Sequence, residues 1–431
     1  MGASWKPSLR MPVCGRSGCS KVLGPRDARD REDPLAAGVD AAVGQLFGTL
    51  RRSVQKNLVL LTLGFVQLLG GCRSGQGKLS LAALSRCLPT AGTAHAREKR
   101  LHRFLANWRL DPKGVSGGLA RMIFGRRGRG LWPVVFDQTK AGSAEALVAG
   151  IPFEGRVLPL AAYTFEYPWM EHAVASQNQL EEIFLADVET ALPAGVRGVF
   201  IGDRGYGRAS LLRHSETVGR LFVIRGRTGT RVEWQGRRLK LGELACAPGC
   251  ACRYRGVLYQ AEQRVRVDVV AYHDPHFQQP WFLLVPPDSA AVLPTKTVVA
   301  LYRERMQVEQ GFRDLKTHLG LRGLQLKVKI AERTGRLLLA FFLAYTLALC
   351  LGASADVEAA RPELETPRHR PRHGTTRTLS VLSLACLVLS LPHWRDRARS
   401  ALARLVDGVT RGRPLLERGP PRSRTRCLIA A

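Results

Sequence analysis

The sequence is 431 residues long and 45% hydrophobic, so it is large enough to bury a core and to form two or three folding units. Its 65 Lys and Arg residues against 35 Asp and Glu give a formal net charge of +30, and an excess this large needs a polyanion to offset its self-repulsion. Nucleic acid is therefore the expected partner. An acidic membrane surface and a ribosomal-type basic protein are the alternatives that charge alone leaves open.

The first thirty residues lack the apolar stretch of a secretory signal, and the ten cysteines are scattered, which together indicate reduced thiols in a cytosol. Cys246, Cys250 and Cys252 form a C-x3-C-x-C cluster without a convincing second pair of zinc ligands, so free thiols in a loop are preferred to a zinc site. The longest apolar stretch, residues 337–351, is shorter than the roughly 20 residues of a membrane span. It predicts a buried core helix and no membrane contact.

Residues 1–40 are rich in Gly, Pro, Arg and Asp without a sustained periodicity, which predicts a disordered segment. In residues 41–110 apolar side chains recur at three- and four-residue spacing, which predicts a small all-α domain. Its last helix, residues 97–108, carries apolar side chains on one side: Leu101, Phe104, Leu105 and Trp108. The other side is basic and includes Arg100 and Arg103. A DNA-contacting helix and a merely solvated basic face give this same pattern.

Residues 131–226 alternate strand-like and helical segments, which predicts a layered α/β core. Strands are expected near 131–137, 145–150, 156–164, 195–202 and 220–227, and helices near 176–192 and 208–217. Two of the strands end in or just before an acid, Asp137 and Asp203. Since ligands bind at the carboxyl edge of an α/β sheet, we expect both acids to project from that edge.

The second half of the chain changes period twice. Residues 227–296 alternate with a period of two and predict a β-strand insertion. Residues 297–352 return to the core with a long helix, capped by Thr295 or Thr297, and an apolar helix from Glu332 to about Leu351. Residues 353–431 open with an Arg-, Pro- and His-rich linker and continue as a basic helical region, with helices near 379–391 and 394–406.

The long helix carries four functional side chains on one stripe. Tyr302, Arg305, Glu309 and Lys316 stand at offsets 0, 3, 7 and 14, which fall within roughly 60° of one another at about 100° per residue. The neighbouring stripe is apolar and should be buried; it consists of Leu301, Val308, Phe312, Leu315 and Leu319. Charges opposite a core are ordinary for a helix, but this column beside the apolar seam is less usual.

Three carboxylates, those of Asp137, Asp203 and Glu309, are expected to converge at the sheet edge. They would repel one another and raise each other's pKa values unless cations neutralise them. Ligands that offer only oxygen suit hard ions such as Mg²⁺ or Mn²⁺. A pair of such ions about 4 Å apart can activate a water or a 3′-hydroxyl and stabilise the departing oxygen of a phosphoryl displacement.

The segments VVFDQTK, IGDRGYG and Y302-x2-R305-x3-E309-x6-K316 resemble the DDE transposases of bacterial insertion sequences, in the insertion-sequence-four family. The resemblance covers roughly residues 55–350. It implies an RNase H-like catalytic core interrupted by a β-rich insertion and preceded by the small all-α domain, which would bind DNA. It also implies that Asp137, Asp203 and Glu309 hold two Mg²⁺ or Mn²⁺ ions.

The resemblance extends to DNA contacts. Tyr302, Arg305 and Lys316 would contact phosphates of the transposon end, and Arg204 would either pair with Asp203 or touch DNA. Trp281 matches a Trp that stacks on a flipped base in relatives, although a core Trp on a strand fits equally well. Met306 departs from the aromatic residue that relatives commonly carry after the motif Arg.

The expected function is that of a cut-and-paste DNA transposase, which binds terminal inverted repeats of double-stranded DNA and cleaves and transfers strands. A homodimer holding two ends, in the cytoplasm and nucleoid of a bacterium, is implied by the resemblance. A related metal-dependent nuclease and an inactive, domesticated DNA-binding protein are the rival interpretations. Intact carboxylates argue against the second rival, because a protein that only binds DNA gains nothing from acids beside phosphates.

Overall fold

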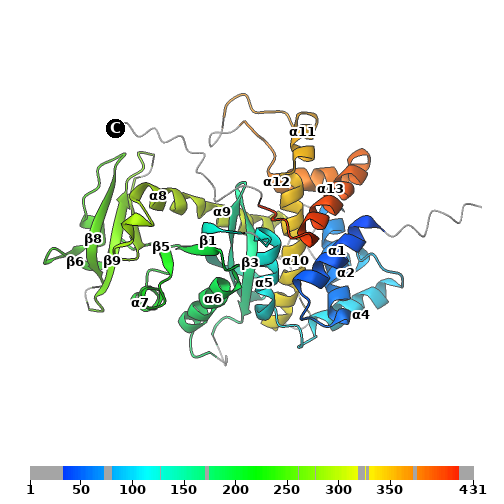
Figure 1. The fold of residues 1–431 in the computed structure, drawn as a ribbon, viewed down its shortest axis with the longest axis horizontal. Coiled ribbons are helices and arrows are strands. Elements are labelled where there is room, and N and C mark those ends of the chain that lie inside the picture. The colour runs from blue at the N-terminus through cyan, green and yellow to red at the C-terminus, as the bar shows by residue number, and fades with distance from the viewer. Residues whose placement is uncertain are drawn as a thin grey trace, which may run out of the picture. The chain divides into compact units, whose positions relative to one another are not determined.

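The computed structural model describes residues 33–71, 80–126, 128–169, 174–260, 262–276, 278–318, 326, 330–371 and 376–416. The described residues from Pro34 onward belong to one compact unit, in which a large mixed sheet adjoins a group of helices (Figure 1). Of the N-terminal segment that the sequence predicts to be disordered, residues 1–32 lie outside the described part.

One half of the sheet is an α/β core. Its strands run in the order β3-β2-β1-β4-β5 and are β1 (Gly130–Ala141), β2 (Ala144–Phe153), β3 (Arg156–Phe165), β4 (Val196–Gly202) and β5 (Leu221–Arg225). The pairs β1–β4 and β4–β5 are parallel, whereas β1–β2 and β2–β3 are antiparallel. Helices α6 (Gln177–Ala191) and α7 (Ala209–Thr217) separate the later strands. This mixed α/β arrangement is consistent with an RNase H-like DDE core.

The predicted insertion continues the same sheet. Its strands follow β5 in the order β10-β9-β8-β6-β7 and are β6 (Arg231–Trp234), β7 (Arg237–Lys240), β8 (Ala251–Tyr259), β9 (Val265–Tyr272) and β10 (Trp281–Val285). The junction is antiparallel, with Leu283 opposite Arg225. Strands β6 and β7 form a hairpin, in which Gln235 and Gly236 of the connecting turn adopt positive φ angles of 50° and 75°.

Helix α1 (Pro34–Leu46) begins inside the segment 1–40, so the expected disorder does not extend to residue 40. Pro34 suits the first turn of a helix because its fixed φ is helical and its missing N–H has no partner there anyway. The residues Leu35, Val39 and Val43 then recur every four positions and are all buried. A spacing of four places them on one face, which explains the early start.

The predicted all-α region contains α2 (Arg52–Gly71), α3 (Leu81–Arg86), α4 (Ala94–Leu105) and α5 (Ser116–Phe124). Its helices do not pack only with one another. Helix α2 packs against α10 (Ala331–Gly352) and α12 (Val381–Ser390), and α1 packs against α13 (Pro392–Thr410). Residues from both ends of the chain therefore share one hydrophobic core beside the sheet (Figure 1).

Two helices, α2 and α10, are long and apolar enough to cross a membrane by length and composition alone. Core helices pass the same test, and the most apolar window of α10 is completely buried in the fold. Helix α10 also packs along β3. The prediction that residues 337–351 form a buried core helix is confirmed.

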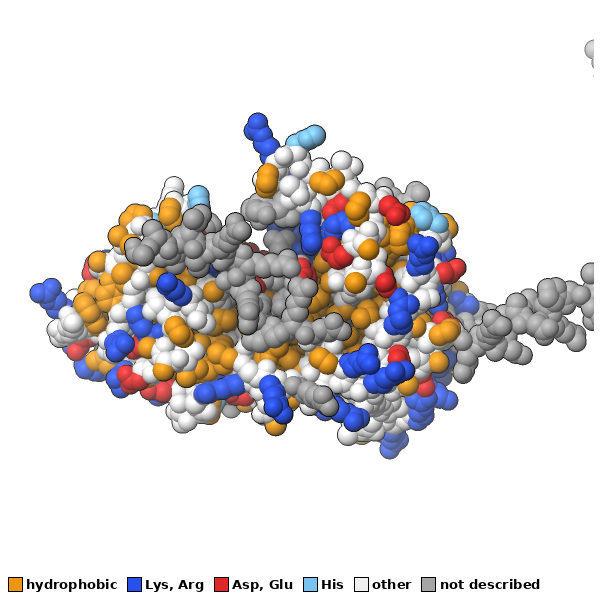
Figure 2. Space-filling model, turned by 45° about the horizontal axis from the view of Figure 1, so that its top comes forward, with side chains coloured by type: hydrophobic (Ala, Val, Ile, Leu, Met, Phe, Trp, Pro, Cys, Tyr) orange, Lys and Arg blue, Asp and Glu red, His pale blue; other side chains and the backbone are white. Residues whose placement is uncertain are grey.

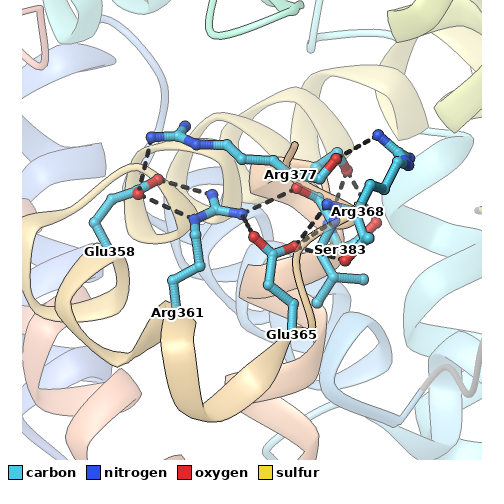
Figure 3. A network of polar contacts seen from close by, with 9 residues as sticks. Glu358, Arg361, Glu365, Arg368, Arg377 and Ser383 are labelled. Carbon is cyan, nitrogen blue, oxygen red and sulfur yellow. Dashed lines mark hydrogen bonds and ion pairs between the residues drawn. The ribbon is translucent and has the colours of Figure 1, made fainter. Parts of the chain in front are cut away.

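Helix α11 (Ala355–Leu364) occupies part of the segment that the sequence predicts to be a linker. The expectation of a linker directly after Gly352 is therefore wrong. Arg361 of this helix is held by Glu358, at 2.8 Å, and by Glu365, at 2.7 Å (Figure 3). Glu365 also accepts hydrogen bonds from the backbone N–H groups of Thr378 (2.9 Å) and Leu379 (2.6 Å) (Figure 3). The Arg- and Pro-rich composition concealed these specific polar contacts.

Short 3-10 turns lie at Lys113–Val115, Leu241–Glu243 and Ser289–Ala291. The last of these turns leads into α8 (Thr295–Glu304), which is followed by α9 (Met306–Arg313) and a π-helical turn at Asp314–His318. On the face seen in Figure 2, Lys and Arg side chains are spread widely over the surface. That distribution agrees with the net charge of +30.

Candidate active site

Asp137 and Asp203 are brought together by the register of two parallel strands. Val135 of β1 pairs with Ile201 of β4, and each acid lies two residues further along its own strand direction. The sequence predicts that Asp137 is the last residue of its strand. In the structure β1 continues to Ala141, because it is the partner of β2. Asp137 nevertheless lies two residues past Val135, where the pairing of β1 with β4 ends, at the carboxyl edge of β4.

Glu309 reaches the same place from helix α9. The guanidinium group of Arg305 links it to the first acid: one nitrogen lies 2.8 Å from Glu309, and another lies 3.4 Å from Asp137. The Arg305 side chain is only 10% exposed, whereas that of Glu309 is 47% exposed. A buried positive charge therefore lies between two acids that the sequence assigns to metal binding.

The electrostatics of the site follow from burial and from these charges. The pKa of Asp137 is raised to about 6, mainly by burial and also by the nearby Asp203 and Glu309, against the lowering effects of the Gln138 backbone N–H and Arg305. For Arg305, burial lowers the pKa, but Tyr302, Asp137, Glu309 and Asp203 raise it and prevail. The pKa of Asp137 and that of Arg305 therefore each depend on the charge of the other group.

The predicted single long helix is interrupted at Arg305, between α8 and α9. Two hydrogen bonds at the interruption span three residues: Arg305 N to Tyr302 O (3.1 Å) and Val308 N to Arg305 O (2.9 Å). This tighter bonding is that of a 3-10 turn. Neither predicted threonine caps the helix, because Pro294 occupies the N-cap position without a side-chain bond.

Lys316 lies in the π-helical turn after α9, so it does not continue the stripe of an ideal α-helix. Its ammonium group lies 5.9 Å from the ring centre of Phe312. The turn is tied to the core by Asp314, which pairs with Arg156 of β3 and accepts a hydrogen bond from Tyr345 of α10 at 3.0 Å. π-Turns of this kind are frequent at functional sites.

The apolar stripe of this helical region is mostly as expected. Val308, Phe312 and Leu315 are buried, and Leu301 is partly buried. Leu319 lies outside the described residues. The buried seam holds α8 and α9 against the sheet and so fixes Glu309 beside β1.

Tyr302 is 2% exposed and belongs to an aromatic group centred on Trp281. Trp281 meets it edge-on, with ring centres 5.0 Å apart, and Tyr272 lies 5.7 Å from Trp281. Burial raises the pKa of Tyr302 in spite of the opposing charges of Arg305 and Arg225. Trp281 is half-buried in this group, which agrees with the core role that the sequence leaves open for it.

Several neighbours of the acids were not singled out from the sequence. Tyr206 is buried, with its ring centre 4.6 Å from that of Phe136, and its pKa is raised by burial and by Asp137, Glu181 and Asp203. Glu181 of α6 is 2% exposed and pairs with Arg208. Tyr206 follows Asp203 within the segment IGDRGYG, so that short segment was the available signal.

The remaining basic candidates are Arg204, which directly follows Asp203, and two arginines of α4. Arg204 and Arg103 are exposed, and Arg100 is half-buried and donates a hydrogen bond to Asn57 at 2.7 Å. Trp108 was predicted to lie on the apolar side of the helix with Arg100 and Arg103, but it is 75% exposed. The reason is that α4 ends at Leu105, so residue 108 no longer shares the helix face.

The three candidate metal ligands are the carboxylates of Asp137, Asp203 and Glu309. The described residues contain no group of three or more His, Cys, Asp or Glu side chains placed to hold a metal ion. The oxygen-only donors of Asp137, Asp203 and Glu309 fit a hard divalent ion in chemistry. The intervening guanidinium has an Nε atom that is buried without a hydrogen-bond partner, so this arginine is not optimally bonded between the acids.

The cysteine cluster does not form a metal site in the described part of the chain. Cys246, Cys250 and Cys252 are not joined in disulfides. Cys246 donates to the carbonyl oxygen of Cys250 at 3.4 Å. Burial raises the pKa of the Cys246 thiol, which disfavours the thiolate form that a metal would require.

Residues 172–347 match the family described as Transposase DDE domain. The matched segment includes Asp203 and Glu309, whereas Asp137 precedes it. No curated protein matches the chain. The match implies transposase activity, and residues 172–347 are assigned by it to the transposase DDE domain, a family of phosphoryl-transfer enzymes.

Proposed function

We propose that this chain is a DNA transposase in which Asp137, Asp203 and Glu309 are the metal-binding catalytic residues. The observation that carries the proposal is that Asp137 and Asp203 lie together at the edge where β4 ends, next to a helix that presents Arg305 and Glu309. The family match over residues 172–347 supports it. The motif spacing from Tyr302 to Lys316 supports membership of the insertion-sequence-four family.

Two divalent ions, Mg²⁺ or Mn²⁺, would be held by the three acids and would supply activation of the attacking oxygen and stabilisation of the departing one. The chain's own residues prepare that site. The short connection from β4 to α7 holds Asp203, whose carboxylate accepts a hydrogen bond from the backbone N–H of Gly205 at 2.7 Å. Asp137 accepts a similar bond from the N–H of Gln138 at 2.8 Å.

Arg305 has two roles in this proposal. While it lies between Asp137 and Glu309 it offsets their repulsion, and it must swing away before both acids can turn to a metal. The displaced guanidinium would then bind a DNA phosphate, for which its planar donors are suited. The unpartnered Nε supports this exchange, because leaving the acids does not break a bond at that atom.

The proposed substrate is double-stranded DNA that carries the terminal inverted repeats of an insertion sequence, which is cut and then joined to a target. Lys316 and Arg204 would bind phosphates, and Tyr302 would position Arg305 from its buried place. Trp281 would support Tyr302 or meet a flipped base, and Arg100 and Arg103 would contact the repeat. We further propose a homodimer that holds two ends in the cytoplasm and nucleoid of a bacterial cell.

The test is Mg²⁺-dependent nicking of a plasmid that carries the DNA flanking the coding region. Asp137→Ala, Asp203→Ala and Glu309→Ala proteins should each lose on the order of a hundredfold or more of the nicking rate. The matched control is Glu216→Ala, which removes an exposed acid of α7. Wild-type nicking by all three variants would refute the assigned site.

The products separate the transposase from its two rivals. Joined products with a new strand connection support transposition. Nicking without joining identifies a metal-dependent nuclease, and DNA binding without nicking in Mg²⁺ or Mn²⁺ identifies an inactive DNA-binding protein.

A further inference from the structure

Trp108 is the most exposed large hydrophobic residue in the described part of the chain, with 75% of its surface accessible. It lies in the turn that follows α4 and is flanked by buried residues: Leu105 is 1% exposed and Leu110 is 0% exposed. Leaving an indole in water forgoes the free energy that its burial would contribute. Trp108 is thus an exposed indole between two buried leucines, a position that its own packing does not favour.

The turn that carries Trp108 is held firmly from beneath. Arg336 of α10, itself 7% exposed, donates hydrogen bonds to the carbonyl oxygens of Leu105 (2.8 Å) and Leu110 (2.9 Å). Asn107 closes the turn, since its carbonyl accepts from Leu110 N–H at 3.0 Å and its side chain accepts from Arg109 N–H at 3.3 Å. The backbone on both sides of the Trp is thus fixed while its side chain is displayed.

A cation lies beside the ring of Trp108. The guanidinium of Arg109 lies 5.0 Å from the centre of the indole ring, as in a cation–π pair. Exposed cations also occur on the preceding elements at Arg86, Lys99 and Arg103. A protein-binding hot spot would be expected to sit among further apolar groups, whereas a ring among cations suits a polyanion that has flat bases.

We propose that Trp108 and Arg109 form a preformed stacking site for an unpaired DNA base. The inference rests on the proposed function, because it requires a DNA substrate. The indole and the guanidinium plane present flat surfaces to the base, and the neighbouring cations bind the backbone phosphates. Fixing the turn in advance reduces the ordering cost of capture.

The site is also tied to the catalytic half of the chain. Arg336 lies near the start of α10, which follows the segment that carries Glu309 along the chain. The same buried side chain therefore joins the base-stacking turn to the helix that packs along β3. A base held by Trp108 would keep a fixed position relative to the sheet that carries Asp137.

The test compares binding of a fully paired duplex oligonucleotide with binding of the same duplex containing one unpaired 2-aminopurine. The wild type should prefer the DNA with the unpaired base and should quench its fluorescence by stacking. Trp108→Ala should lose about tenfold of that preference, and Trp108→Phe should keep most of it. Arg109→Ala should weaken the preference less than Trp108→Ala does.

Two control variants remove matched side chains elsewhere: Val218→Ala, an exposed apolar residue after α7, and Arg411→Ala, an exposed cation after α13. Both should keep the wild-type preference. Thermal unfolding of Trp108→Ala should match the wild type because the side chain is exposed. If Trp108→Ala unfolds at a lower temperature than the wild type, the binding preference of Arg109→Ala is used instead. An unchanged preference for the unpaired base in Arg109→Ala then overturns the proposal.

The inference is overturned if the wild type binds both DNAs equally, or if Trp108→Ala retains the preference. A loss that is equal for paired and unpaired DNA also overturns it, because the Trp would then act on the duplex or its backbone. These outcomes are independent of the proposed function, which is judged by metal-dependent nicking with the wild type. If the wild type nicks DNA but shows no preference for the unpaired base, the stacking site is refuted and the proposed function is not.

Discussion

The guanidinium group of Arg305 donates a hydrogen bond to the Glu309 carboxylate across 2.8 Å, one helical turn away along the chain. The same group faces Asp137, so a single cation serves two acids. We expect Arg305→Ala to leave the acids with uncompensated repulsion, and therefore to lower the stability of the metal-free protein by about 2 kcal/mol.

Added Mg²⁺ should offset that repulsion, so it should raise the melting temperature of Arg305→Ala more than that of the wild type. Thermal unfolding with and without Mg²⁺ measures both effects. Arg303→Ala serves as the control, because Arg303 pairs with Asp274 and not with the acids of the site. An equal Mg²⁺ shift in all three proteins would contradict this interpretation of Arg305.

Asp137→Asn should stabilise the metal-free fold and abolish nicking. Burial raises the pKa of Asp137 to about 6 from an ordinary 3.8, so the folded state disfavours its charged form. The protonated carboxyl favours folding fully below the ordinary pKa, and this contribution is lost as the pH rises through about 6. At pH 7 the substitution should therefore add up to about 3 kcal/mol to the free energy of unfolding.

Denaturation of the wild type and Asp137→Asn at pH 5 and at pH 7 tests this sign. The gap between the two proteins should be larger at pH 7. Asp268→Asn provides a contrast, since Asp268 is a fully buried acid paired with Arg253 at 2.9 Å, and its loss should destabilise the fold. A wild type that is more stable than Asp137→Asn at pH 7 would show that Asp137 is structural.

Glu365 gives the opposite pH dependence. Although burial raises its pKa, hydrogen bonds from Arg361, from the Leu379 N–H, and from the hydroxyl and N–H groups of Thr378 lower it to about 2 (Figure 3). Such a carboxylate stabilises the fold above its ordinary pKa of 4.5, and that contribution disappears as the pH falls toward 2. Glu365→Gln should cost about 1–3 kcal/mol at pH 7.

The acid limb of stability should also be less steep in Glu365→Gln than in the wild type, because the substituted side chain no longer takes up a proton. Chemical denaturation between pH 3 and pH 7 measures the slope. Glu363→Gln changes an exposed acid two residues away and should follow the wild type. Identical slopes in Glu365→Gln and the wild type would remove Glu365 from this role.

Gly352→Ala should disrupt the contact between α10 and α12. A Cβ atom at Gly352 would lie 1.8 Å from the backbone oxygen of Val381, so one helix end must shift. We expect a loss of about 3 kcal/mol in the free energy of unfolding. Gly71→Ala is the control, because nothing lies within 4 Å of its added Cβ at the end of α2. Equal stability of both variants would contradict the close packing.

The strands and the convergence of the acids could be predicted because they depend on local patterns. The apolar runs before Asp137 and Asp203 produce β1 and β4, and parallel pairing then places both acids at one edge. The position of Glu309 beside Arg305 was predictable from the helical spacing of the two residues. In each case one short segment carries both the pattern and the acid.

The features that escaped prediction depend on distant partners. The interruption at Arg305 accompanies contacts with Asp137, which is 168 residues away along the chain. Trp108 looked like a core residue by spacing, but α4 ends before it, at a turn that Arg336 holds from a distant helix. No local periodicity reports such long-range bonds.

The antiparallel junction of β5 with β10 brings the two ends of the insertion together in the sheet. The chain leaves the core at Arg225 and returns beside it, with Leu283 opposite, so a tight hairpin could join these neighbouring strands directly. The path onward through α8 to Glu309 would start from the same place. We therefore expect that changes in the length of the insertion's turns do not move the acids, as long as Tyr272 and Trp281 keep their places in the aromatic group with Tyr302.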